Sequence, residues 1–129
     1  KEDYVEFQYS LRAEKMSWRD QMEKELCILA GIYDMTVDVY SKFPSWEFNP
    51  DSALRNTLLK AYKEVKGTEM ELLATHGGLE CGVFCDMIPG LDVVTLGAET
   101  DGAHTPQEQM NLKSFDQTFE VLKNLLERL

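Results

Sequence analysis

The sequence predicts an α/β fold, in which a β-α-β unit is followed by an α-β-α-β-α segment on a parallel or mixed sheet. Two segments within residues 1–45 alternate apolar and polar side chains with the period of a strand. Further along, stretches with apolar residues at helical spacing are separated by short apolar runs that are typical of buried strands. Strands that alternate with helices favour a parallel sheet, whose ligands bind at the carboxyl ends of the strands.

The β-α-β unit occupies residues 1–45. A half-buried strand is predicted over residues 4–12, then a helix over 17–30 that begins at Ser17 and ends at Gly31, then a strand over 36–43. A unit of this size cannot close a hydrophobic core by itself. Its open strand edges predict pairing with a second chain, and therefore a dimer or a domain-swapped assembly.

The second part, residues 46–129, begins with a connector and a helix that Asn49 or Asp51 caps and Gly67 ends. The loop over 97–110 is long and polar, which favours a functional role. The other expected elements are a strand over 70–74, a helix over 79–87, a strand over 92–96 and a helix over 111–129. The buried side of this last helix is predicted to carry Leu112, Phe115, Phe119, Leu122, Leu126 and Leu129.

Charge, hydropathy and cysteine content exclude several classes of partner and site. The 129 residues include 13 Lys and Arg against 23 Asp and Glu, a net charge of −10, which argues against nucleic acid and against an anionic membrane surface as partners. No apolar run is long enough for a transmembrane helix. Three cysteines at irregular spacing give no disulfide framework, so a reducing cytoplasm fits best. The chain begins at Lys1 and runs almost directly into a predicted strand, so we expect that an upstream part is missing.

The two histidines are the most informative residues, because both stand beside or close to glycine in predicted loops. His76 belongs to the stretch Thr75–Gly82, and His104 follows Gly102-Ala103. Glycine lets the backbone approach a ligand closely. Both loops leave predicted strands at the carboxyl edge of the sheet, so we expect them to converge in space. The sequence therefore predicts part of a site for a metal or a small substrate, with too few groups to complete it.

Each candidate has a functional and a structural interpretation. His104 suits a zinc ligand, or it is an ordinary histidine of a surface loop. A predicted helix start contains His76, the backbone N–H of Gly78 and Glu80, which could bind a substrate there. Glu80 has a structural interpretation as well, because an acidic side chain in the first turn is favoured by the helix dipole. Arg12 suits a clamp on a carboxylate, or it is a solvated arginine.

Four stretches resemble the bacterial aminoacyl-histidine dipeptidases, which are cytosolic non-specific Xaa-His dipeptidases related to carnosinase. The resemblance covers essentially the whole chain in order. The stretches are Thr75–Gly82, read as THGGLECG; Ser10-Leu11-Arg12; Phe43–Trp46 with Asn49–Ser52; and His104-Thr105-Pro106 with Glu108. Two mild departures are Ser45 where the family has glycine and Thr105 where it has serine.

The resemblance implies a piece of a larger enzyme. Residues 1–45 would form the C-terminal half of a lid and dimerisation domain, and residues 46–129 the C-terminal segment of a catalytic domain that holds two zinc ions. His104 would be the last zinc ligand, and Arg12, His76, Gly78 and Glu80 would lie on the substrate side. The other ligands and the catalytic glutamate would belong to the missing N-terminal half of the same polypeptide. The resemblance therefore implies no catalytic residue in this chain and little or no peptidase activity of the chain alone.

Two other classes remain open from the residues themselves. The first is a small α/β module whose His76, Glu80 and Arg12 hold an anion without catalysis. The second is a structural module that pairs through its open strand edges. The length of the natural gene distinguishes these modules from an enzyme that hydrolyses dipeptides.

Overall fold

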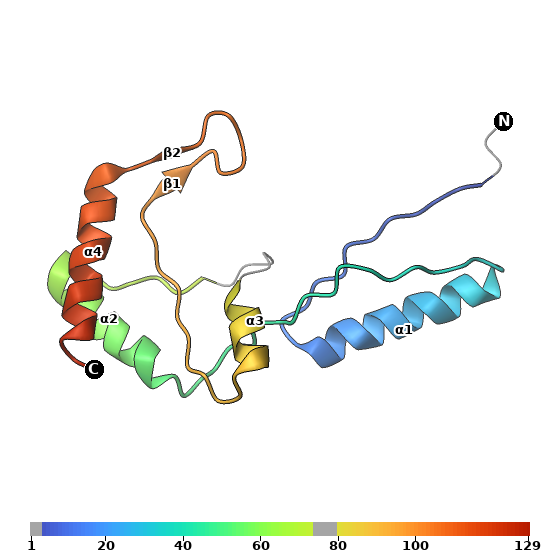
Figure 1. Cartoon of the computed structure of the whole chain (residues 1–129), viewed down its shortest axis with the longest axis horizontal. Helices are drawn as coiled ribbons and strands as arrows, with labels where there is room; N and C mark the ends of the chain where they lie inside the picture. The colour runs from blue at the N-terminus through green and yellow to red at the C-terminus, as the bar shows by residue number, and fades with distance from the viewer. Residues whose placement is uncertain (1–3, 74–79) are drawn as a thin grey trace. The chain divides into compact units, whose positions relative to one another are not determined.

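The computed structural model describes residues 4–73 and 80–129, which form four helices and one short hairpin (Figure 1). The chain divides into two compact units. Unit 1 is Lys1–Phe48 with Thr75–Met87, and unit 2 is Asn49–Ala74 with Ile88–Leu129. The elements are α1 (Met16–Ile32), α2 (Ala53–Lys66), α3 (Glu80–Met87), β1 (Thr100–Asp101), β2 (Gln109–Met110) and α4 (Leu112–Leu126).

Unit 2 has its hydrophobic core between α2 and α4. Leu58 and Ala61 of α2 meet Val121 and Leu125 of α4, and all four side chains are at most 4 % exposed. Burial of aliphatic side chains at this level contributes about 1.5–3 kcal/mol for each large side chain. Six partly buried side chains complete the cluster: Leu54, Tyr62, Val65, Met70, Val94 and Leu96.

The buried face of α4 differs from the face that its sequence predicts. Ser114, Val121 and Leu125 are buried against the rest of unit 2. The six residues expected on that side are all exposed in the described chain: Leu112 70 %, Phe115 52 %, Phe119 54 %, Leu122 38 %, Leu126 61 % and Leu129 74 %. The prediction is wrong because α4 has apolar residues on two faces, and α2 covers only one of them.

The N-terminus of α2 is held by two side chains. Ser52 is the N-cap and accepts a hydrogen bond from the backbone N–H of Arg55 at 2.9 Å. Asp92 accepts from the backbone N–H of Leu54 at 2.9 Å. Hydrogen bonds from the Ser52 side chain and from Leu54 lower the pKa of Asp92 below its ordinary value of 3.8. The segment that contains Asp92 is therefore tied to the start of α2.

The predicted N-cap of α2 is wrong, whereas its predicted C-terminal stop is confirmed. Neither Asn49 nor Asp51 is the N-cap; the side chain of Asn49 instead accepts from the backbone N–H of Asp51 at 3.0 Å. At the other end Gly67 has a left-handed φ of 71° and stops the helix, as predicted.

The long strands that alternation predicts do not form within the described residues. The segments 4–12, 36–43, 70–73 and 92–96 run as extended traces without a strand ladder, and the strands described, β1 and β2, are antiparallel (Figure 1). Alternation marks faces that can be buried, but a strand also requires a neighbour that completes its hydrogen bonds. The expectation of a parallel or mixed sheet is therefore not realised in the part of the chain that the structure describes.

In unit 1, helix α1 begins earlier and ends later than the predicted caps suggest. Lys15 is the N-cap, without a side-chain cap, and Ser17 lies inside the first turn. The helix continues through Gly31 to Ile32, and the left-handed backbone falls at Asp34, whose φ is 52°. Aspartate tolerates this conformation better than most residues with a β-carbon, so Gly31 is not needed as the stop.

The rest of unit 1 is held together where two distant segments meet. The Ser45 hydroxyl donates to the carbonyl of Ala13 at 3.0 Å. A β-carbon built on Gly82 of α3 would come within 2.7 Å of the carbonyl oxygen of Pro44. Glycine at residue 82 is therefore required by the close approach of α3 to the backbone around Pro44.

Across residues 4–73 and 80–129, no helix combines the length and the apolar character that a membrane crossing requires.

Candidate functional site

His104 lies in the connection of a short antiparallel hairpin. Strands β1 and β2 pair Thr100 with Met110 and Asp101 with Gln109. The hairpin is thus different from the predicted loop, which was expected to leave a parallel strand. An antiparallel pair needs only a turn to reverse the chain, and glycine, threonine and proline after β1 supply turn-forming residues.

The backbone of His104 has a left-handed conformation, with a φ of 64°. Its N–H donates to Oε2 of Glu108 at 3.3 Å. The residue is exposed to solvent. An exposed imidazole on a turn with a fixed backbone is suited to ligation of a metal.

Thr105 makes the largest number of local hydrogen bonds in this turn. Its hydroxyl donates to the carbonyl of Gly102 at 2.7 Å and accepts from the backbone N–H of Gln107 at 3.2 Å. Its backbone N–H donates to the same Gly102 carbonyl at 3.1 Å, and its carbonyl accepts from Glu108 at 3.1 Å. These bonds close the turn on both sides of His104.

Gly102 is the glycine that the turn requires. Its φ is 64°, and a β-carbon there would lie 3.0 Å from the carbonyl oxygen of Gln107. Its backbone N–H donates to the Asp101 carboxylate at 2.9 Å. The prediction that glycine near a histidine permits a positive φ is confirmed for Gly102, two residues before His104.

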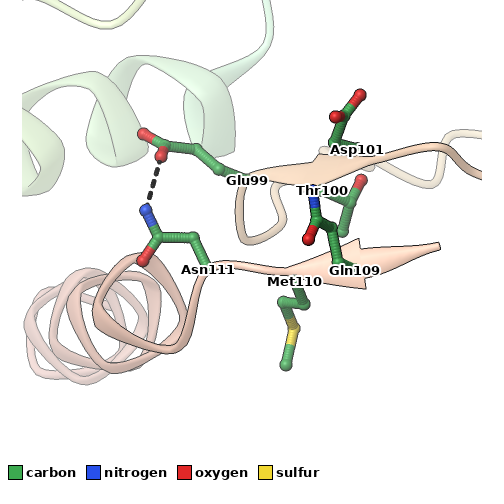
Figure 2. Close-up of a pocket in the computed structure, with 6 residues that line it drawn as sticks. All are labelled: Glu99, Thr100, Asp101, Gln109, Met110 and Asn111. Atoms are coloured by element: carbon green, nitrogen blue, oxygen red, sulfur yellow. Dashed lines mark hydrogen bonds between the residues drawn. The ribbon is translucent and has the colours of Figure 1, made fainter. Parts of the chain in front are cut away.

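A hollow of about 340 Å³ lies at the base of the hairpin (Figure 2). Within it, the Asn111 side chain donates to Oε2 of Glu99 at 3.0 Å, and the backbone N–H of Asn111 donates to the Glu99 carbonyl at 2.9 Å. The Ser114 hydroxyl accepts from the N–H of Glu99 at 2.8 Å. The residues that line the hollow are Glu99, Thr100, Asp101, Gln109, Met110 and Asn111.

Neither Glu99 nor Asn111 was predicted as a site residue, although residue 111 was predicted to start the last helix. A turn-rich stretch between them is the signal that predicts a hairpin with paired ends. Their bonds serve the start of α4, where Asn111 is the N-cap and accepts from the N–H of Ser114 at 3.2 Å. The network at the base therefore fixes the hairpin on α4 and does not by itself form a ligand site.

The other candidates belong to unit 1. Arg12 is exposed, and its Nε donates to the Ser10 hydroxyl at 3.2 Å. Glu80 is the first residue of α3 and is also exposed. His76 and Gly78 lie outside the described residues. Because His104 belongs to unit 2 and the two units are described separately, the expected convergence of the two histidine loops stays a prediction.

The metal-ligating capacity of the described chain is small. Residues 4–73 and 80–129 contain no group of three or more His, Cys, Asp or Glu side chains that could together hold a metal ion. A zinc site usually has three or four protein ligands. His104 therefore fits one position in a ligand set, and the described residues do not complete that set.

The chain is similar to several known hydrolases. The cytosol non-specific dipeptidase of Escherichia coli (strain K12) is 25 % identical over 125 residues, which are 97 % of this chain and 26 % of that relative. The putative [LysW]-lysine/[LysW]-ornithine hydrolase of Pyrococcus abyssi (strain GE5 / Orsay) is 29 % identical over 93 residues, which are 71 % of this chain and 27 % of that relative. The chain thus spans about a quarter of the length of these relatives.

A solved structure shows the same fold. The crystal structure of the aminoacylhistidine dipeptidase from Vibrio alginolyticus matches with a TM-score of 0.80 and 25 % sequence identity. The match covers 91 % of this chain and 24 % of that one. The chain therefore has part of the mixed α/β fold of this dipeptidase.

A family model extends the result to nearly the whole chain. The model of peptidase family M20/M25/M40 matches residues 7–128. The chain belongs to peptidase family M20/M25/M40.

Proposed function

We propose that this chain is the C-terminal part of a zinc-dependent dipeptidase that hydrolyses Xaa-His and other dipeptides. The observation that carries the proposal is the likeness to an aminoacylhistidine dipeptidase over 91 % of the chain, with a TM-score of 0.80. A dipeptidase relative that aligns with 97 % of the chain supports the same activity. Both matches cover about a quarter of the relative, so the rest of the enzyme is to be sought in a longer polypeptide.

In this proposal residues 1–45 are the C-terminal half of a lid and dimerisation domain, and residues 46–129 are the end of the catalytic domain. The exposed apolar side chains of the extended segments support a role in association, since Val5, Phe7 and Tyr9 are at least 60 % exposed. We propose that these segments complete a sheet with other strands, including those of a second copy in a homodimer. A cytoplasmic location is consistent with the name of the Escherichia coli relative.

His104 is the proposed zinc ligand of this chain. Bound zinc would polarise a carbonyl group or lower the pKa of a bound water. Arg12, His76, Gly78 and Glu80 are proposed on the substrate side, where Arg12 would pair with a carboxylate and Glu80 with an amine. The remaining ligands and the catalytic base are proposed to come from the upstream half, so the chain alone is expected to be inactive.

The test is a hydrolysis assay with a dipeptide that ends in histidine. The longer polypeptide that contains this sequence is expected to cleave it, to lose activity on chelation of its metal and to lose it at least about 100-fold in His104→Ala. Gln107→Ala in the same turn is the matched control, because its exposed side chain is not assigned to the site. It should keep activity within about twofold.

The alternatives predict different results. An anion-binding or dimerisation module without catalysis would cleave no dipeptide at any metal concentration. Tight stoichiometric zinc binding by the isolated 129-residue chain would contradict the proposed division of ligands.

A further inference from the structure

We propose that Thr105 and Glu108 are positioning residues for the His104 imidazole, and that they act by holding the backbone of His104 in its left-handed conformation. The inference rests on the proposed function, because it assigns these residues to the same metal ligand. Neither residue is proposed to touch the metal.

The conformation of His104 needs an explanation. Three non-glycine residues of the described chain have positive φ, namely Asp34, Ser41 and His104. Positive φ is disfavoured for residues with a β-carbon, because the side chain crowds the following carbonyl. Of the three, His104 carries the largest side chain. Histidine enters this region more often than most residues with a β-carbon, but the conformation is still uncommon, so the hydrogen bonds around it contribute to holding it.

Glu108 holds the residue directly. Its Oε2 accepts from the backbone N–H of His104 at 3.3 Å, which fixes the amide plane before the histidine. A carboxylate is a stronger acceptor for an N–H group than a neutral oxygen. The side chain of Glu108 therefore acts on the orientation of His104 and not on its ring.

Thr105 holds the turn from the other side. Its hydroxyl donates to the Gly102 carbonyl at 2.7 Å and accepts from the Gln107 N–H at 3.2 Å. Gly102 precedes His104 and Gln107 follows it, so these two bonds join both sides of the turn. The same hydroxyl geometry is available to serine and not to valine or alanine. The turn therefore depends on the oxygen at residue 105 and not on the methyl group.

The consequence for metal binding is preorganisation. A ligand whose backbone is already in the bound conformation loses less conformational freedom when the metal binds. Loss of the groups that orient a metal ligand typically weakens metal affinity about 10–100-fold. We therefore expect Thr105 and Glu108 to affect the affinity for zinc through His104.

The first experiment measures zinc affinity in the longer polypeptide by competition with a chromogenic chelator. Thr105→Ala and Glu108→Ala are expected to weaken zinc binding about 10-fold, and Thr105→Ser to stay within about twofold of the parent. Glu108→Gln should lie between, because its amide oxygen can still accept the N–H of His104. The melting temperature is expected to change little, which separates positioning from a general loss of fold.

A double-mutant cycle decides whether the effect passes through His104. In a His104→Ala background, Thr105→Ala is expected to cause no further loss of zinc affinity. An equal loss in both backgrounds would overturn the positioning role. Parent-like zinc affinity of Thr105→Ala together with a strong effect of His104→Ala would overturn this inference and leave the proposed function intact. Zinc affinity that is unaffected by His104→Ala would contradict the proposed function itself.

A second experiment needs no metal and uses the 129-residue chain. Amide hydrogen exchange of His104, followed by NMR, is expected to be at least about fivefold faster in Glu108→Ala than in the parent. Gln107→Ala is the control and should leave this rate unchanged. An unchanged rate in Glu108→Ala would show that the carboxylate does not hold the His104 amide.

Discussion

Helices α1 and α4 are both long, yet they differ in what covers them. Helix α4 buries Val121 and Leu125 against α2, whereas α1 buries no side chain and leaves Trp18 56 % exposed. Both helices have apolar residues at helical spacing. The spacing of apolar residues therefore predicts a helix and its apolar face, but burial of that face also requires another element that packs against it.

Helix α4 repeats this contrast between its own two faces. Leu125 is 4 % exposed and its neighbour Leu126 is 61 % exposed, although the two side chains are identical. Exposed apolar surface of this kind is typical of an interaction surface. In the proposed enzyme, this second face is available to the upstream half of the polypeptide.

The largest expected effect is on the α2–α4 core. Leu125→Ala should lower the free energy of unfolding of the chain by about 3 kcal/mol, because it removes buried methyl groups and leaves a cavity. Leu126→Ala is the matched control and should change it by less than about 1 kcal/mol, since that side chain is already in water. Urea unfolding followed by circular dichroism measures both. Equal effects would show that the second face of α4 is covered in solution.

The next largest effect tests unit 1. Gly82→Ala should destabilise this unit by about 1–3 kcal/mol, because its new methyl group would meet the Pro44 carbonyl. Gly31→Ala is the control: nothing lies within 4 Å of its β-carbon, and alanine should stabilise α1 by about 0.5–1 kcal/mol. Both tryptophans, Trp18 and Trp46, belong to unit 1, so urea titration by tryptophan fluorescence reports on it. A neutral Gly82→Ala would argue against the contact of α3 with Pro44.

The smallest effect concerns the start of α2. Ser52→Ala should lower the free energy of unfolding of unit 2 by about 1 kcal/mol through loss of the N-cap.

The pKa of Asp92 is lower in the folded state than its ordinary value of 3.8, so its stabilising contribution is present above that value. The contribution is lost as the pH falls through the lower folded pKa.

Asp92→Asn supplies the pH test. The difference in unfolding free energy between the parent and Asp92→Asn should be constant near pH 6 and shrink below about pH 4. A difference that does not depend on pH would show that the Asp92 charge makes no contribution.

Part of the fold is predictable from the sequence because it depends on local chemistry. Gly67 ends α2 as its residue type predicts, and α4 begins close to residue 111, where its helical spacing starts. The segments around Val5 and Val37 have the pattern of strands but lack a ladder within the described residues, because strand pairing depends on distant neighbours. Their side chains remain exposed at 73 % and 43 %.

The candidate site shows the same division. Residue types and their order in the sequence identify the family and predict His104 as a candidate metal ligand. The left-handed φ of His104 and its bond to Glu108 do not, because they depend on how a turn closes on itself. The interaction of Asp92 with α2 was also missed, since it joins residues 38 positions apart.

The contact of Gly82 with the backbone around Pro44 joins two segments that are synthesised at different times. Unit 1 contains residues from before and after the first stretch of unit 2, and unit 2 resumes at Ile88. Synthesis proceeds at about 5–20 residues per second, so segments far apart in the sequence become available seconds apart. The N-terminal segment of unit 1 can therefore meet α3 only after the first segment of unit 2 has been synthesised, and α2 can meet α4 only after α3 has been synthesised.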